Sequence, residues 1–126
     1  MTWSTKPTRL AAADLGAYLR VDIDSNGKYA LADASTAGVG VTEYAVSAGD
    51  HAGIAPLNGG GTREMTAAGA IGEGADVYAA AGGKVQALPA VAGTYYKVGV
   101  AFEAASADGD VIEVMPIEIG KETTVV

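Results

Sequence analysis

Cysteine is absent from this 126-residue sequence, which excludes disulfide bonds and thiolate metal sites. There is one histidine, His51, and no second histidine with which it could share a metal ion or form a catalytic triad. Aromatic residues make up only 6% of the chain although 49% of it is hydrophobic, because alanine supplies much of the apolar count. Alanine buries little area, so we expect a thin core and added stability from oligomerisation.

Basic residues are also scarce. The chain has 8 Lys and Arg against 15 Asp and Glu, a formal net charge of −7 and a sequence pI near 4.4. This balance argues against a surface for nucleic acid or for anionic membranes, since both require clustered Lys and Arg. No run approaches the roughly 20 apolar residues of a membrane span, and the N-terminus lacks the basic-then-apolar form of a signal peptide. We therefore expect no nucleic-acid partner and no membrane association.

What the sequence does contain is an internal repeat. Residues 98–117 match residues 39–57 at an offset of 59, which becomes 60 where Asp108 is inserted. The identical pairs are Val39/Val98, Gly40/Gly99, Val41/Val100, Ala45/Ala104, Ser47/Ser106, Ala48/Ala107, Gly49/Gly109, Asp50/Asp110 and Pro56/Pro116. A repeat of this length indicates one supersecondary unit used twice.

A second match lies upstream of the first. Asn26-Gly27 is a strong signal for a two-residue hairpin turn, because both residues tolerate positive φ. At an offset of 56 it is matched by Gly82-Gly83. The repeat units are therefore residues 21–57 and 77–117, and each unit predicts a hairpin, a loop and a second hairpin.

Short segments with strand periodicity recur between these turn signals. Within residues 96–104, for example, one face carries only apolar residues, and the opposite face carries Lys97, Gly99 and Glu103, which is the period of a half-buried strand. The apolar face is formed by Tyr96, Val98, Val100, Phe102 and Ala104. Roughly eight or nine such strands predict an all-β fold, a small β-barrel or sandwich built from two similar hairpin-loop-hairpin halves. Pro56 and Pro116 cannot donate to a ladder, so we expect each to end its strand or to lie on an edge.

The domain organisation follows from these boundaries. We expect an N-terminal arm over residues 1–20, a single β domain over residues 21–119 and a short tail over residues 120–126. Residues 9–20 could form a short helix weakened by its glycine, and an extended conformation is an equal alternative. The candidate partner-binding residues of the arm are Trp3, Pro7 and Leu10, because aromatic anchors dominate interfaces. The alternative is that Trp3 packs on its own domain or is disordered.

One local pattern resembles a calcium loop. Asp22, Asp24 and Asn26-Gly27 have the alternate spacing of an EF-hand, and Asp33 occupies the twelfth position. However, no helix pattern follows, aspartate replaces the usual final glutamate, and the duplicated hairpin has no acids around its turn. We therefore favour a plain Asn-Gly hairpin with solvated aspartates, and expect no cofactor.

Nothing in the sequence marks a catalytic site. His51 follows Asp50 in a predicted turn, where a solvated surface residue is expected. The serines have no nucleophile-elbow context, and the glutamates are scattered without an evident acid–base pair. We expect a protein that is not an enzyme.

The repeat motifs resemble those of the small Gly/Ala-rich head-decoration, or capsid cement, proteins of tailed bacteriophages. Members show V-G-V/I-A-x-E-A-A followed by G-D-x-V-x-V. Here residues 98–105 and 109–114 carry the two motifs, with Ile112 where a valine is expected, and residues 70–74 and 38–50 add to the likeness. The resemblance covers roughly residues 21–118.

This resemblance implies a decoration protein on the outer surface of a mature phage head. It would be made in the host cytoplasm, bind the major capsid protein, often as a homotrimer, and stabilise the shell. The alternative is a carbohydrate- or surface-binding β module of a fibre or spike, for which Trp3 and Tyr95-Tyr96 are the available aromatics. An N-terminal arm that adds a strand to a shell subunit is a further expectation.

Overall fold

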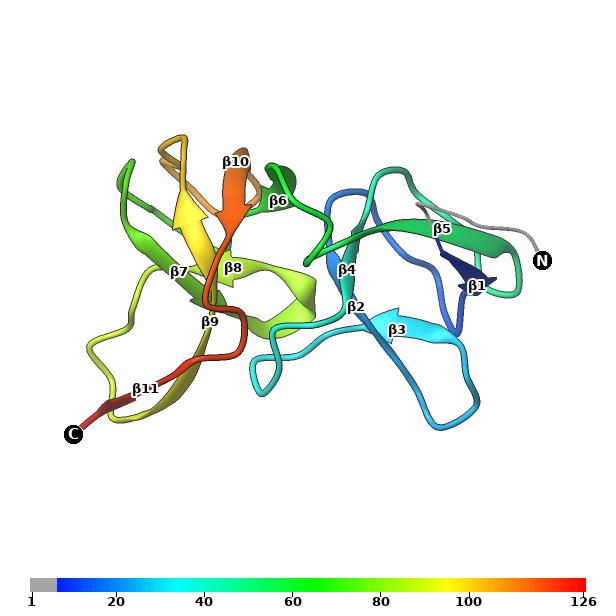
Figure 1. Cartoon of the computed structure of the whole chain (residues 1–126), viewed down its shortest axis with the longest axis horizontal. Coiled ribbons are helices and arrows are strands. Elements are labelled where there is room, and N and C mark those ends of the chain that lie inside the picture. Colours follow the sequence, from blue (N-terminus) through cyan, green and yellow to red (C-terminus); the bar gives the residue numbers. More distant parts are fainter. Residues whose placement is uncertain (1–6) are drawn as a thin grey trace.

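The computed structural model describes residues 7–126, and these form an all-β protein, which confirms the predicted fold class (Figure 1). A single 3-10 turn, η1 (Ala81–Gly83), is the helical segment of the described part. The strands are β1 (Thr8–Leu10), β2 (Arg20–Ile23), β3 (Tyr29–Leu31), β4 (Gly40–Thr42), β5 (His51–Pro56), β6 (Arg63–Thr66), β7 (Asp76–Ala79), β8 (Val85–Gln86), β9 (Gly93–Ala101), β10 (Val111–Pro116) and β11 (Glu122–Val125).

The strands form two antiparallel sheets that lie side by side as two lobes (Figure 1). The first sheet has the order β1-β5-β4-β2-β3, and the second has the order β6-β10-β9-β7-β8, with β11 added to β9. The two orders are the same when each strand of the first lobe is matched with the strand five places later. The predicted pair of similar halves is therefore present in the topology.

Isolated bridges extend this correspondence beyond the predicted repeat. Ala11 forms a parallel bridge with Tyr29, and its counterpart Ala67 forms a parallel bridge with Val85. These bridges bring the two edge strands of each sheet together at one point only, so the sheets are not closed into barrels. The repeat thus begins at β1 and β6, upstream of the limits expected at residues 21 and 77.

The N-terminal arm expected over residues 1–20 differs from the structure. From Thr8 on, the chain belongs to the first sheet, because β1 pairs with β5. Ala11 and Leu15 are 1% and 2% exposed and form part of the core. The short helix considered over residues 9–20 is absent, because Leu15 instead bridges to Val46.

The short tail expected over residues 120–126 is also wrong in part. Strand β11 lies within it and pairs with the first half of β9, from Glu122 opposite Tyr96 to Val125 opposite Gly93. The two prolines behave as predicted, since Pro56 and Pro116 are the last residues of β5 and β10.

Two clusters of buried side chains form the core. The first lies within the first lobe and contains small and medium apolar residues with one tyrosine, Tyr29. The second fills the other lobe and also takes in Ala37, Val41 and Leu57 from the first lobe. The apolar core therefore continues across the boundary between the two sheets.

A buried arginine reinforces this boundary. Arg20 is 0% exposed, and its guanidinium donates hydrogen bonds to carbonyl oxygens of both lobes. In the first lobe, the acceptors are the carbonyl oxygens of Thr36 at 2.6 Å and Asp33 at 3.3 Å. In the second lobe, they are the carbonyl oxygens of Ala80 at 2.7 Å and Lys84 at 3.0 Å. One side chain thus connects the two sheets through backbone acceptors.

Candidate functional site

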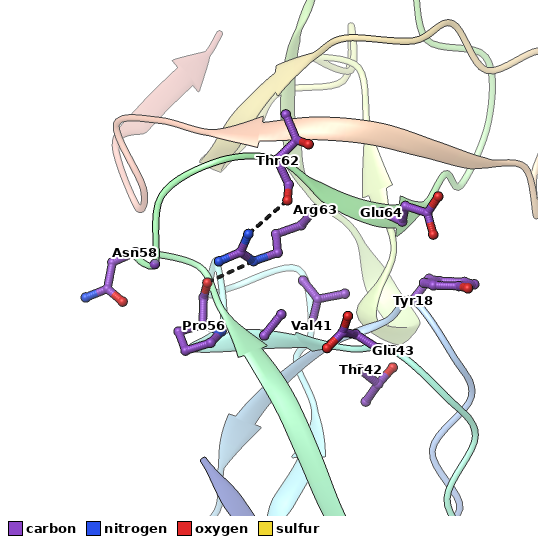
Figure 2. A pocket seen from close by; sticks show the side chains of 11 residues that line it. Tyr18, Val41, Thr42, Glu43, Pro56, Asn58, Thr62, Arg63 and Glu64 are labelled. Atoms are coloured by element: carbon purple, nitrogen blue, oxygen red, sulfur yellow. Dashed lines mark hydrogen bonds between the residues drawn. The ribbon is translucent and has the colours of Figure 1, made fainter. Parts of the chain in front are cut away.

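A cleft of about 610 Å³ opens where the two lobes meet. Strands β4 and β5 form one wall, β6 forms the other, and the loop after β5 closes one end (Figure 2). Gly60 and Gly61 allow this loop to turn, because both adopt positive φ, at 77° and 73°. The cleft is therefore a consequence of how the chain crosses from the first sheet to the second.

Arg63 shapes the loop end of the cleft. Its Nε donates to the carbonyl of Pro56 at 3.1 Å, and its Nη1 donates to those of Gly60 at 3.0 Å and Thr62 at 2.8 Å. Figure 2 shows the guanidinium lying against this backbone at the same end as Asn58. The positive charge of Arg63 is thus held by carbonyl oxygens of the loop and stabilises its course.

Tyr18 stands at the opposite end of the cleft. Its N–H donates to the carbonyl of Thr42 at 2.8 Å, and its own carbonyl accepts from the N–H of Thr66 at 2.9 Å and from the hydroxyl of Thr66 at 3.0 Å. Both lobes therefore fix the backbone of Tyr18. Its half-buried ring lines the cleft (Figure 2).

The backbone of Tyr18 has an unusual conformation for its residue type. Its φ is 59°, in the left-handed region that favours glycine. The equivalent residue of the second lobe is Gly74, with φ 85°, whose N–H donates to the carbonyl of Ala101 at 2.7 Å as that of Tyr18 donates to Thr42. The first lobe thus carries a large aromatic residue where the second lobe carries glycine.

Two exposed carboxylates accompany Tyr18. Glu43 follows β4 and Glu64 lies in β6, and both line the cleft at the end where Tyr18 stands (Figure 2). Within residues 7–126, the Glu64 side chain makes no hydrogen bond or ion pair. The cleft therefore combines an acidic, aromatic end with a loop end in which Arg63 is held by backbone oxygens.

Two of the three aspartates of the candidate calcium loop, Asp24 and Asp33, accept hydrogen bonds in turns. Asp24 accepts from the N–H groups of Asn26 at 2.9 Å and Lys28 at 3.0 Å, within the hairpin that β2 and β3 form. Its carboxylate is therefore bound in the turn and not simply solvated. Asp33 accepts from Ser35, and this hydrogen bonding lowers the pKa of its carboxyl. Across the described residues, no three His, Cys, Asp or Glu side chains gather into a metal site, so Asp22 has no such cluster to join.

Two of the three predicted partner-binding residues, Pro7 and Leu10, are described by the structure, and neither lines the cleft. Trp3 is outside the described residues. Pro7 precedes β1, and its carbonyl accepts from the hydroxyl of Tyr29 at 3.1 Å. Leu10 pairs with His51, and both are exposed.

Sequence reasoning did not identify the cleft residues Tyr18, Glu43, Arg63 and Glu64. One signal was present, because Ala11-Ala12 and Leu15-Gly16 match Ala67-Ala68 and Ile71-Gly72 at an offset of 56. Extending the repeat in this way aligns Tyr18 with Gly74 and marks the substitution. Which residues face each other across the lobes has no local signature in the sequence.

The second lobe has an extension that the first lobe lacks. Strand β9 has 9 residues against 3 in β4, and its first half pairs with β11 beyond the body of the sheet (Figure 1). Lys97 lies at the base of this ribbon and contacts Asp76 at 3.2 Å and Glu118 at 2.6 Å. The hydrogen bond to Glu118 raises the pKa of Lys97. The hydrogen bonds that Glu118 accepts from Lys97 and Lys121 lower the pKa of its carboxyl.

Comparison with known families decides what kind of protein carries this fold. The family model described as phage cement protein matches residues 11–116. The chain belongs to the phage cement protein family. The match begins at Ala11, upstream of the resemblance noted over residues 21–118, in agreement with the extended repeat. No curated protein matches the sequence.

The fold of this cement protein is also found among solved structures. It is similar to the N base of head fiber gp8.5 in bacteriophage phi29, with a TM-score of 0.72 and 18% identity over 94% of this chain and 98% of that chain. At this identity the similarity shows a common fold. Among residues 7–126 of the cement protein, no helix is long and apolar enough to cross a bilayer.

Proposed function

We propose that the protein decorates the outer surface of a mature phage head, where it binds the major capsid protein. The observation that carries this proposal is the family match over residues 11–116. The net charge of −7 fits a position outside the shell, away from packaged DNA. Synthesis in the host cytoplasm and later addition to the virion complete the proposal.

Stabilisation of the shell follows from binding to more than one subunit. A protein that binds only the assembled shell shifts the equilibrium away from separated subunits by mass action. Binding, and not catalysis, is the activity proposed, which fits a structural phage family and the absence of a second histidine. The test is to add the protein to purified heads that lack it and to measure the temperature at which packaged DNA is released. No binding to these heads, or no rise in that temperature, would refute the proposal.

We propose that the protein acts as a homotrimer on the head. The side of the molecule that carries the β9–β11 ribbon exposes several apolar residues, which are the kind of surface that interfaces cover: Leu88, Val91, Ile117 and Ile119. Analytical ultracentrifugation gives the mass in solution, and quantitative gel analysis of decorated heads gives the number of copies per shell subunit. A ratio that corresponds to fewer than three copies at each binding site would argue against a trimer.

We also propose that the segment around Trp3, Pro7 and Leu10 contacts the shell. Removing residues 1–18 would not test this idea, because Ala11 and Leu15 are core residues. Removing residues 1–6 leaves every described strand in place. Unchanged occupancy of heads by the shortened protein would exclude the role of Trp3.

A second candidate function is a surface- or carbohydrate-binding base of a fibre or spike. The structural similarity to a head fiber base favours it. Glycan-array binding that is stronger than binding to heads would support this function instead of decoration.

A further inference from the structure

We propose that the cleft between the two lobes receives a lysine or arginine side chain from an extended segment of the shell subunit. This inference rests on the proposed function, and it names the residues through which decoration would take place. The occupant is inferred from the charge and shape of the acidic end of the cleft, where Tyr18, Glu43 and Glu64 come from three separate segments (Figure 2).

The size of the cleft fits a peptide segment. Its volume of about 610 Å³ lies in the range of pockets that enclose a ligand, which is roughly 300–1,000 Å³. The walls are mixed, with Val41 and Ala55 apolar and Thr42 and Thr62 polar. A site of this composition can bury the aliphatic stem of a long side chain while its charged end reaches the carboxylates.

The charges indicate the sign of the occupant. Glu43 and Glu64 are both exposed carboxylates at one end, whereas the guanidinium of Arg63 is directed to three backbone oxygens of the loop. A cation that enters beside Tyr18 can lie against the face of its ring, and a ring face attracts cations. The net charge of −7 adds a favourable long-range field.

The repeat provides an internal comparison. Gly74 adopts the positive φ of this position without strain, and Tyr18 adopts it at φ 59° with an unfavourable contact between its Cβ and the backbone. The ring of Tyr18 is only half-buried, so core packing does not account for it. A tyrosine at this position is explained if its ring contacts a partner.

This comparison supplies a variant that separates binding from folding. Tyr18→Gly restores the residue type that the second lobe uses at the same φ, so the fold is retained. We expect its affinity for heads lacking the protein to fall about tenfold or more, because the ring contact is lost. Tyr18→Phe keeps the ring and should bind within about twofold of the wild type.

The charge is tested by the double variant Glu43→Gln and Glu64→Gln. It should bind heads about tenfold more weakly and lose much of the salt dependence of binding. The matched control is Glu73→Gln with Glu122→Gln, which removes two exposed carboxylates outside the cleft. Co-sedimentation at several protein concentrations and two salt concentrations measures the wild type and every variant, and circular dichroism confirms that each is folded.

The outcomes distinguish the inference from the function on which it rests. Wild-type protein that does not bind heads would refute decoration itself. Wild-type binding with unchanged binding of Tyr18→Gly and of the cleft double variant would overturn the inference and leave decoration standing. If the cleft and control double variants weaken binding to heads equally, the effect is one of general charge, and the inference is overturned. If Tyr18→Gly changes the mass of the protein in solution, the occupant of the cleft is a second copy of this chain, which also overturns the inference.

Discussion

Replacement of Arg20 by methionine tests whether one buried side chain holds the two lobes together. Methionine replaces the aliphatic stem with an unbranched apolar side chain and removes the guanidinium. Burial lowers the pKa of Arg20 to about 10, so the group is charged at neutral pH and its hydrogen bonds are charge-assisted. The substitution removes donors from carbonyl oxygens of both sheets at once.

The size of the effect follows from the contacts. Three carbonyls, those of Thr36, Ala80 and Lys84, accept from Arg20 at 2.6, 2.7 and 3.0 Å. Leaving a buried carbonyl without a donor costs about 1–3 kcal/mol. This cost applies to the carbonyls of Thr36 and Ala80, because that of Lys84 keeps the N–H of Ala80 as a donor at 2.9 Å. Methionine also relieves the desolvation of a buried charge, which offsets part of that loss. We expect the free energy of unfolding to fall by about 3 kcal/mol.

The assay is urea unfolding followed by circular dichroism. We propose that the wild-type lobes unfold as one domain, in a single cooperative transition, because the core and Arg20 both cross the boundary. In Arg20→Met we expect a lower midpoint and a broader transition as the lobes lose their coupling.

An exposed arginine provides the control. Arg9 donates to the carbonyl of Gly27 at 3.0 Å at the surface, so Arg9→Met should cost less than about 0.5 kcal/mol. If Arg20→Met loses no more stability than Arg9→Met, Arg20 does not hold the lobes together and the reasoning from its contacts is refuted.

Two further predictions concern the second lobe and its contact with the first. Hydrogen bonding to Lys97 and Lys121 lowers the pKa of Glu118 below its usual 4.5. The ionised Glu118 therefore stabilises the fold above pH 4.5, and this stabilisation is lost as the pH falls through the lowered pKa. Glu118→Gln should flatten the acid limb of a curve of unfolding free energy against pH. The partner Lys97 has a raised pKa, so its contribution is lost only as the pH rises above 10.5. At Gly83 a Cβ would lie 2.8 Å from the carbonyl oxygen of Arg20, whereas at Gly82 nothing lies within 4 Å. Gly83→Ala should therefore lower the melting temperature clearly more than Gly82→Ala, and equal shifts would contradict the close approach.

Local chemistry in the sequence was sufficient to predict much of this fold. The hairpin at Asn26-Gly27 and the strand-ending Pro56 and Pro116 depend on neighbouring residues in the chain, and they are present as predicted. The same is true of the two similar halves, because a repeated sequence pattern produces a repeated topology.

Two local predictions differ from the structure. The turn at Asn26-Gly27 differs in detail, because Asp24 and Lys28 still pair across it and Gly27, but not Asn26, has a positive φ. The alternation predicted over residues 96–104 is wrong, because β9 ends at Ala101, Lys97 is buried and Phe102 is exposed.

The errors at the two ends have a common cause. Residues 8–20 and 120–126 contain weak local signals, and short strands of three or four residues are held by their partners more than by their own propensity. The pairing of β1 with β5 and of β11 with β9 joins segments that are distant in the sequence, so local patterns alone assigned these segments to an arm and a tail.

The composition by itself determined that this protein has no thiol chemistry, a thin alanine-rich core and an acidic surface, since these properties depend on which residues are present and not on where they lie. The tertiary structure alone decided that Arg20 is buried between the lobes and that Tyr18 and Glu64 meet at one cleft. Contacts between separate sheets depend on the packing of the whole chain, and no short stretch of sequence encodes them.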